Sequence, residues 1–211
     1  MIPAKRFYMI RHGQTEHNAA RLMAGHTDSP LTETGKLQAR QVQEVMRRLE
    51  EKPKVIVHSN LSRARDTAGI INEVLGVPMH EDPDIAEHYC GDWEGLPYEE
   101  CESMLTGWDT PPNGESFEAF CARIARSKTN TLNTHDNPAL IVCHGGVFRA
   151  FGKLYGLNTP GVFKNCHLYE FMPAPEEPRF PWRVWSYGLD QDDFREETRV
   201  YHDSDRLDED R

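Results

Sequence analysis

Phe7-Tyr8-Met9-Ile10-Arg11-His12-Gly13 is the stretch of sequence that decides the fold. Its four apolar residues are not interrupted by polar ones, which predicts a short strand buried on both faces. Gly13 then permits a sharp turn. Arg11 and His12 are therefore expected at the carboxyl edge of the sheet, where open α/β folds bind ligands. Such a pair suits an anion with an electrophilic centre, because the guanidinium can hold its oxygens while the ring nitrogen attacks.

The same pattern recurs far downstream, where Ala139-Leu140-Ile141-Val142-Cys143 leads into His144-Gly145-Gly146. Two strands that end in His-Gly suggest a pair of imidazoles facing each other across neighbouring strand ends. Val55-Ile56-Val57 is a further buried run, and Arg63 follows it in the first turn of an expected helix that Ser62 can cap. An arginine at a helix N-terminus opposes the helix dipole, so an anion shared with the helix amides explains it better than an exposed position.

Helical patterns separate these strands and place the sheet inside the molecule. Thr32 can cap the first helix, and apolar periodicity predicts others over residues 115–132 and 147–155. The alternation over residues 7–155 predicts an α/β fold: a three-layer α/β/α sandwich with a mostly parallel central sheet. A closing pair of strands is expected over residues 167–172 and 182–187.

A chain of 211 residues suits one domain with a small lid. We expect this domain at residues 1–188, with a short lid insertion at about residues 88–114, where tryptophan and proline occur without a clear period. Residues 189–211 form an acidic C-terminal tail that is expected to be partly disordered. From Asp190 to Arg211 it holds ten acids and four arginines, a net charge of −6. Its candidates for docking on the domain are Val200, Tyr201 and Leu207.

Composition limits the classes of partner and the cellular compartment that we expect for the protein. The net charge of −10 argues against nucleic-acid binding, although an anionic substrate needs only local positive charge. The five cysteines are odd in number and lack C-x-x-C spacing, which fits free thiols in a reducing, cytoplasmic compartment. The start at Met1 fits no signal peptide, and no apolar run reaches the ~20 residues that a membrane span needs. The sequence leaves open whether the chain forms a homo-oligomer.

An ordered set of motifs resembles the histidine phosphatase superfamily, also called the phosphoglycerate mutase-like family. Each motif is weak alone, but together they are specific and extend over about residues 5 to 172. The set comprises Arg11-His12-Gly13, Asn18, Leu61-Ser62-Arg63-Ala64, Glu87, Gly91-Asp92-Trp93-Glu94-Gly95, Gly114-Glu115-Ser116 and His144-Gly145.

The resemblance implies a metal-independent phosphomonoester hydrolase without a cofactor, whose partner is a small phosphorylated metabolite. His12 would attack the phosphoryl group in line and become a phosphohistidine, while Arg11, Arg63 and His144 would clamp the phosphoryl oxygens. Glu87 would protonate the leaving group and then deprotonate the attacking water. The further substrate-binding residues that the resemblance implies are Asn18, Gly25 and Gly145.

Two alternatives keep the same pocket. Mutases of this family return the phosphoryl group to a second substrate oxygen, and Glu87-His88-Tyr89 is similar to their pattern. The stretch Gly91 to Gly95, taken with Gly114-Glu115-Ser116, is instead typical of the phosphatase branch. The other alternative is a non-catalytic binding module that uses the phosphate pocket and the acidic tail.

Two different chemistries also fit parts of the sequence. Cys143 and Arg149 have the C-x5-R spacing of cysteine-based tyrosine phosphatases, although that interpretation leaves Arg11, His12 and Arg63 without a role. A metal site formed by His12, His58 and His144 is the second option, and the neighbouring arginines disfavour it because they would repel a cation.

Overall fold

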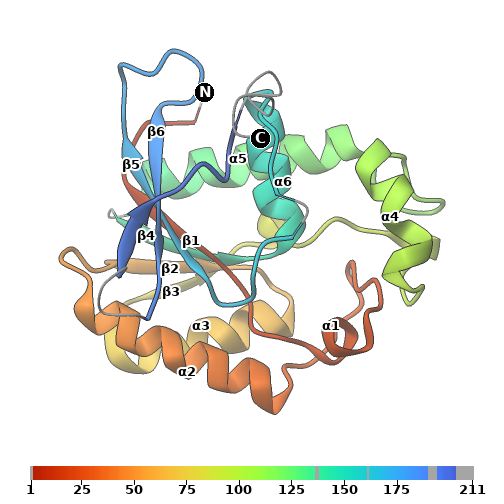
Figure 1. Cartoon of the computed structure of the whole chain (residues 1–211), viewed down its shortest axis with the longest axis horizontal. Coiled ribbons are helices and arrows are strands. Elements are labelled where there is room, and N and C mark those ends of the chain that lie inside the picture. The colour runs from red at the N-terminus through yellow and green to blue at the C-terminus, as the bar shows by residue number, and fades with distance from the viewer. Residues whose placement is uncertain (1, 136–137, 161, 190–193, 203–211) are drawn as a thin grey trace, which may run out of the picture.

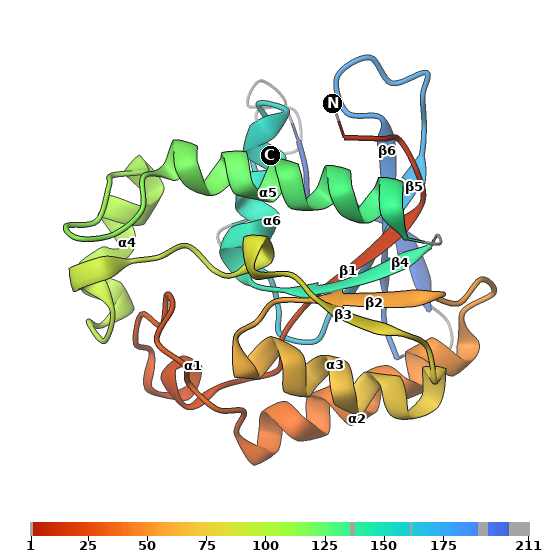
Figure 2. The ribbon, with the colours of Figure 1, turned by 180° about the vertical axis from the view of Figure 1, so that it is seen from behind.

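The computed structural model describes residues 2–135, 138–160, 162–189 and 194–202. They form a seven-stranded sheet in the order β3-β2-β4-β1-β5-β6-β7, with helices on both faces (Figures 1 and 2). The strands are β1 (Phe7–Arg11), β2 (Val55–His58), β3 (Met79–Glu81), β4 (Ala139–Cys143), β5 (Leu168–Pro173), β6 (Trp182–Tyr187) and β7 (Arg195–Glu197). The helices are α1 (Glu16–Ala20), α2 (Glu33–Arg48), α3 (Ser62–Leu75), α4 (Tyr98–Gly107), α5 (Phe117–Thr134) and α6 (Gly145–Leu154), with short 3-10 helices η1 (Pro83–Ile85) and η2 (Gly91–Trp93).

The sheet is parallel on one side and antiparallel on the other. Strands β3, β2, β4 and β1 run parallel, whereas β5, β6 and β7 join them in antiparallel pairs. The predicted α/β/α sandwich is confirmed, but the mostly parallel sheet is confirmed only for the first four strands. A short connection can join β5 to β6 because antiparallel neighbours need no crossover helix. The three-residue edge strands β3 and β7 were not predicted from the sequence.

Alternate residues of β1 face two separate cores. Phe7 and Met9 pack into one cluster with Phe120 and Phe151 of α5 and α6, and both are fully buried. Tyr8 and Ile10 pack into the other, under α2 and α3. Figure 2 shows these two helix layers on opposite faces of the sheet. The uninterrupted apolar run in β1 is therefore explained by burial on both faces.

The predicted cap of α2 is confirmed, whereas the predicted cap of α3 is wrong. The Thr32 side chain accepts a hydrogen bond from the Gly35 N–H at 3.0 Å. Helix α3 begins one residue earlier than a Ser62 cap requires, because Leu61 is the N-cap and Ser62 is the first helical residue. The Ser62 N–H and hydroxyl both donate to Oδ1 of Asp28, at 3.0 and 2.7 Å, so a loop far away in sequence supplies the acceptor.

Part of the segment after residue 189 packs on the sandwich. Strand β7 pairs with β6. Val200 and Tyr201 pack against the larger of the two cores, the one that contains Phe7 and Phe151, as the sequence predicts for both residues. The Tyr201 hydroxyl donates to the Phe148 carbonyl at 3.1 Å. The predicted docking of Leu207 lies outside the described residues, as do residues 190–193 and 203–211 of the tail that is expected to be partly disordered.

The segment expected to be a lid contains the helix α4, which lies beside α1 at one end of the molecule in both views (Figures 1 and 2). The two regions are tied by backbone hydrogen bonds, from the Met23 N–H to the Leu96 carbonyl at 2.8 Å and from the Tyr98 N–H to the Arg21 carbonyl at 2.9 Å. Among the described residues, no helix combines the length and apolar character that a bilayer-spanning segment requires.

Candidate active site

The two histidines that follow buried strands lie side by side. Strands β1 and β4 pair in parallel with Arg11 opposite Cys143, so His12 and His144 leave the same edge of the sheet. The His12 N–H donates to the Cys143 carbonyl at 3.0 Å, and the centroids of the two imidazole rings are 5.1 Å apart. The rings thus meet across neighbouring strand ends, as the sequence predicts.

His12 is held as a neutral ring. Its Nδ1 lies 2.7 Å from the Gly13 carbonyl, which can only accept a hydrogen bond, so Nδ1 carries the proton and Nε2 keeps its lone pair. Burial holds the pKa of His12 well below its ordinary value, and the positive charges of Arg11 and Arg63 lower it further. The free nitrogen therefore keeps its lone pair at neutral pH and can act as a nucleophile.

Arg63 is delivered by the first turn of α3 and is 1% exposed. Its guanidinium donates to the Thr27 carbonyl at 3.0 Å and to the Gly25 carbonyl at 2.7 Å. Arg65, in contrast, is exposed and pairs with Asp66, so only one of the two arginines in this turn faces inward. Gly25, an expected substrate-binding residue, lines the site and also holds Arg63 through its carbonyl.

Unpartnered nitrogens gather where these groups meet. Among the described residues, the buried side-chain atoms that lack a hydrogen-bond partner are Nε of Arg11, Nε of Arg63 and both ring nitrogens of His144. An unpaired buried donor costs about 1–3 kcal/mol, so such a cluster fits the binding of a group that carries several acceptor oxygens. Burial, followed by the charge of Arg63, lowers the pKa of His144 well below its ordinary value.

Glu87 reaches the same site from the segment after η1. Its Oε2 accepts a hydrogen bond from the Gly146 N–H at 3.0 Å, at the start of α6, and its Oε1 accepts from the His88 N–H at 2.9 Å. A Cβ on Gly146 would lie 2.2 Å from Oε1 of Glu87. The absence of a side chain at this glycine therefore makes room for the carboxylate.

Asn18 and Asn165 close another side of the site. Asn18 caps α1 together with Thr15, and its side-chain oxygen accepts from the Asn165 amide at 3.3 Å. The same amide donates to the His12 carbonyl at 2.7 Å. Asn165 was not predicted, because it lies in an irregular loop without a motif, and only its place before β5 could have suggested a position near the strand ends.

Glu94 orders the loop that carries the two carbonyls bound by Arg63. Its carboxylate accepts hydrogen bonds from the backbone N–H groups of His26, Thr27 and Cys90, at 2.7, 2.8 and 3.2 Å. The Thr27 hydroxyl adds a fourth at 2.6 Å. Glu94 is thus a positioning residue, whereas the sequence indicated it only as part of a motif.

Most of these groups line one cleft of about 530 Å³. Its lining does not include Glu94 or the predicted residue His144, whose fully buried ring lies directly behind His12 with the ring centroids 5.1 Å apart. Arg11 and His12 stand at the end of β1, Arg63 comes from α3, and Tyr98 and Trp108 contribute aromatic side chains from the start of α4 and the residue after it. The predicted residues that line it are Arg11, His12, Asn18, Gly25, Arg63, Glu87 and Gly145, and the unpredicted ones include Arg21, Tyr98, Glu99, Trp108, Arg149, Phe163 and Asn165.

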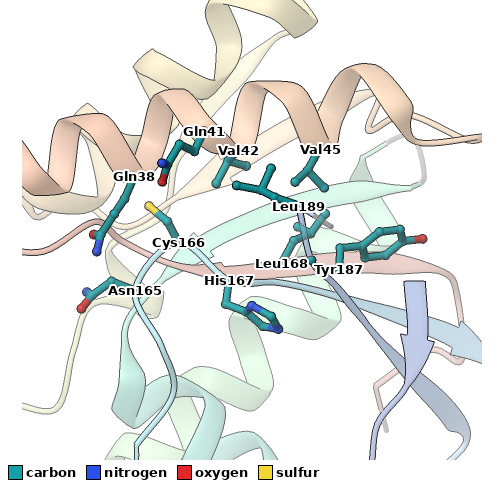
Figure 3. Close-up of a pocket in the computed structure, with 11 residues that line it drawn as sticks. Gln38, Gln41, Val42, Val45, Asn165, Cys166, His167, Leu168, Tyr187 and Leu189 are labelled. Atoms are coloured by element: carbon teal, nitrogen blue, oxygen red, sulfur yellow. The ribbon is translucent and has the colours of Figure 1, made fainter. Parts of the chain in front are cut away.

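A second, smaller hollow of about 200 Å³ lies between α2 and the ends of β5 and β6 (Figure 3). Gln38, Val42 and Leu168 are among its lining residues, and that lining includes no arginine, lysine or carboxylate. Since it has no cationic side chain to hold an anion, we place the chemistry in the larger cleft.

Neither alternative chemistry is supported by the geometry. Cys143 is fully buried at the end of β4, and burial raises the pKa of its thiol to about 12, so it is not the thiolate that a cysteine phosphatase requires. His58 faces its own neighbour, with Nδ1 2.9 Å from the Ser59 carbonyl. Within the described residues, no group of three or more His, Cys, Asp or Glu side chains is placed to share a metal ion.

Comparison with known proteins places this chain in a family. The family model described as histidine phosphatase superfamily (branch 1) matches residues 7–180. The adenosylcobalamin/alpha-ribazole phosphatase of Salmonella typhimurium is 39% identical over 154 residues, which cover 67% of this chain and 75% of that protein. The glucosyl-3-phosphoglycerate phosphatase of Mycobacterium tuberculosis is 32% identical over 182 residues, covering 75% and 80%. A solved structure of a mycobacterial glucosyl-3-phosphoglycerate phosphatase with VO3 matches with a TM-score of 0.70 and 27% identity, covering 85% of this chain and 97% of that one. The chain therefore belongs to the histidine phosphatase superfamily and is a phosphatase.

Proposed function

We propose that this phosphatase hydrolyses a small phosphomonoester through a phosphohistidine formed on His12. The observation that carries the proposal is that the neutral imidazole of His12 lies beside the His144 ring, in a region where buried nitrogens of Arg11, Arg63 and His144 have no hydrogen-bond partner. A phosphoryl group has an electrophilic centre for Nε2 of His12 and oxygens for Arg11, Arg63 and His144. Because negative charge builds on those oxygens in the transition state, preorganised donors stabilise it more than the ground state.

The proton transfers fall to Glu87. In the first step, Nε2 of His12 forms a bond to phosphorus as the ester bond breaks, and protonated Glu87 gives its proton to the leaving oxygen. In the second step, Glu87 takes a proton from water, whose oxygen attacks phosphorus and releases His12 and inorganic phosphate. The hydrogen bond from Gly146 fixes the carboxylate beside the start of α6.

The size of the cleft supports a small metabolite as the substrate. Its volume of about 530 Å³ falls within the range of about 300–1,000 Å³ that is typical of small-molecule sites. Backbone hydrogen bonds join the Arg21–Met23 segment to the chain around the start of α4, and both segments line the cleft. We therefore expect these two segments to contact the leaving group of the substrate.

The decisive experiment combines turnover with trapping of the intermediate. His12→Ala should abolish hydrolysis of p-nitrophenyl phosphate, while His80→Ala, at an exposed position, is the matched control and should leave it unchanged. Rapid quenching of the wild type with labelled substrate should yield a phosphoenzyme that is labile in acid and stable in alkali. Normal turnover by His12→Ala would refute the proposal.

A second comparison tests Glu87. Glu87→Gln should slow the hydrolysis of alkyl phosphates far more than that of p-nitrophenyl phosphate, whose leaving group needs little protonation. Measurement of free phosphate against phosphate transferred to an added acceptor separates hydrolysis from the mutase alternative. Equal losses on both substrates would remove Glu87 from the role of general acid.

A further inference from the structure

The Gly114-Glu115-Ser116 motif and the arginine that pairs with it have no role in the hydrolytic steps proposed above. Glu115 stands directly before Ser116, the N-cap of α5, whose side chain accepts a hydrogen bond from the Ala119 N–H at 3.2 Å. Arg123, farther along α5, forms an ion pair with Glu115 at 2.6 Å. Neither member of this pair is among the residues that line the cleft. Any effect of the pair on turnover therefore passes through other residues.

Arg123 uses every N–H group of its guanidinium. A guanidinium has five N–H donors in one rigid plane. Nε donates to Oε1 of Glu115 at 2.8 Å, and Nη2 donates to Oε2 at 2.6 Å. The other donors go to the backbone carbonyls of Asp84 and Ala86, at 2.9 and 2.7 Å, and of Glu87, at 2.6 Å. A side chain committed in this way has no donor left for a ligand, so it acts on the chain that it holds.

The segment that Arg123 holds carries the proposed general acid. Residues 86–90 form neither helix nor strand, so no regular pattern of backbone hydrogen bonds fixes them. Arg123 supplies donors to the carbonyls of this segment up to that of Glu87. His26 adds a second donor to the Glu87 carbonyl, with Nε2 at 2.7 Å. The backbone that bears the Glu87 carboxylate is thus anchored independently of the contacts that the carboxylate itself makes.

Glu115 anchors the two residues that follow Glu87. Its carboxylate accepts a hydrogen bond from the Tyr89 N–H at 3.0 Å, and its own N–H donates to the Tyr89 carbonyl at 3.0 Å. Its carbonyl accepts from Nε2 of His88 at 2.9 Å. A Cβ on Gly114 would lie 2.7 Å from the Tyr89 carbonyl oxygen, so the glycine lets the two segments approach. The motif therefore gives space through its glycine, binds the segment through its glutamate and starts α5 with its serine.

The ion pair is shielded from solvent, with 12% of the Arg123 side chain and 17% of the Glu115 side chain exposed. Burial raises the pKa of Glu115, but the hydrogen bonds from Arg123 and from the Tyr89 N–H outweigh that effect and hold it below its ordinary value. The Arg123 Cζ also lies 4.6 Å from the centroid of the Phe120 ring, and that ring stacks on the imidazole of His88 with a centroid distance of 5.0 Å. The guanidinium is thus held by an ionised carboxylate and by an aromatic ring.

We propose that the Arg123–Glu115 pair positions Glu87 and thereby sets the efficiency of proton transfer to the leaving group. The inference rests on the proposed function, because it assumes that Glu87 is the general acid. A general acid has to lie within about 2.6–3.2 Å of the oxygen that it protonates, so a small displacement of its backbone removes most of its benefit. Arg123 and Glu115 are positioning residues, since neither touches the substrate.

Two aryl phosphates that differ mainly in the basicity of the leaving oxygen provide the test. p-Nitrophenol leaves with little protonation, whereas phenol depends more on a proton from the enzyme. Arg123→Met should therefore lower kcat on phenyl phosphate about tenfold more than kcat on p-nitrophenyl phosphate. The inhibition constant of inorganic phosphate should stay unchanged, because His12, Arg11 and Arg63 keep their places.

Further variants separate positioning from general damage. Arg123→Lys keeps the charge opposite Glu115 but has three donors instead of five, so it should restore part of the selective loss. Glu115→Gln keeps the shape of the side chain and sets an amide N–H against other donors, so it should reproduce that loss, and it carries the test if Arg123→Met does not fold by circular dichroism. Arg126→Met, at an exposed arginine of α5 that pairs with the Asp84 side chain at 3.3 Å, is the matched control and should leave both rates unchanged.

A double-variant cycle with Glu87 gives the sharpest result. Glu87→Gln already lacks the acid, so adding Arg123→Met should cause no further selective loss on phenyl phosphate. Equal losses of Arg123→Met and Glu115→Gln on both substrates would overturn the inference, because they would indicate a structural role. Selective losses that multiply in the double variant would also overturn it.

The two proposals fail differently in these assays. If Glu87→Gln slows phenyl phosphate selectively and the variants of Arg123 and Glu115 do not, only the positioning role is refuted. If Glu87→Gln itself shows no selectivity, the general acid has been assigned wrongly, and this inference falls with it. Turnover that does not depend on His12 refutes the phosphohistidine mechanism whatever the other variants show.

Discussion

Lys128 is a fully buried lysine whose removal should stabilise the protein. It lies on α5 in the larger core, with Nζ 2.8 Å from the Met9 sulfur and 4.6 and 5.0 Å from the ring centroids of Phe151 and Phe7. Burial lowers its pKa to about 8 from an ordinary value of 10.5. Lys128→Met keeps a long, flexible side chain at this place and removes the charge.

The pKa sets the size of the effect. The difference between a pKa of about 8 and the ordinary value of 10.5 corresponds to about 3 kcal/mol against the charged form. Part of the gain is offset by the loss of the cation–π contacts, so we expect Lys128→Met to raise the free energy of unfolding by about 2 kcal/mol at pH 7. A lowered lysine pKa destabilises the fold fully below about pH 8, and the effect fades as pH rises from about 8 toward 10.5.

Urea unfolding at pH 7 and pH 9.5, followed by tryptophan fluorescence, measures this effect. The difference in unfolding free energy between Lys128→Met and the wild type should shrink by about 1–2 kcal/mol between the two pH values, because the native wild type releases its proton there. Comparing the two proteins at each pH cancels the other titrating groups. Lys54→Met, at an exposed lysine, should change stability by less than about 0.5 kcal/mol. A less stable Lys128→Met variant, or a difference independent of pH, would refute the reasoning.

The remaining predictions concern the cleft. Gly146→Ala should displace the Glu87 carboxylate and lower kcat on alkyl phosphates about 100-fold in steady-state assays. Gly69→Ala is the control on α3, because nothing lies within 4 Å of the added Cβ, and it should raise the free energy of unfolding in urea by about 0.5–1 kcal/mol. Glu94→Gln replaces an oxygen that accepts backbone N–H groups by an amide donor, so kcat/KM should fall about tenfold through a misplaced Arg63; unchanged activity would contradict its positioning role. Cys143→Ser should retain phosphatase activity within a few-fold and lose about 1–2 kcal/mol of stability, and loss of activity in a folded variant would reopen the cysteine mechanism.

The fold and the centre of the site could be predicted because their signals are local. A continuous apolar run such as Phe7 to Ile10 has to be buried on both faces, which requires helices on both sides of the sheet. Parallel neighbours bring their carboxyl ends to one edge, so two runs that each end in His-Gly predict that the imidazoles of His12 and His144 meet. Arg63 was predicted in a similar way, because a cation in the first turn of a helix interacts unfavourably with the helix dipole unless an anion binds beside it.

The rest depends on contacts between distant segments, which a local pattern does not contain. Helix α4 has no apolar period, and it is held by backbone bonds to the Arg21–Met23 segment. Ser62 was predicted as a cap from its position alone, but Asp28 of another loop supplies the acceptor and shifts the start of the helix. Trp108 and Asn165 carry no motif, since only the folded chain places them at the cleft.

The buried cluster of Arg11, Arg63 and His144 shows how this fold combines stability with binding. Nitrogens of Arg11, Arg63 and His144 are buried without protein partners, so donors stand ready before any ligand arrives. An anion that supplies oxygens to them meets dipoles that are already oriented, which is the condition for strong electrostatic stabilisation of a transition state. The free protein tolerates this arrangement because the backbone fixes it from several sides: the carbonyls of Gly25 and Thr27 hold Arg63, and the carbonyl of Phe163 holds Arg11 at 2.7 Å. The same contacts that keep these cations apart from solvent therefore also orient them for the substrate.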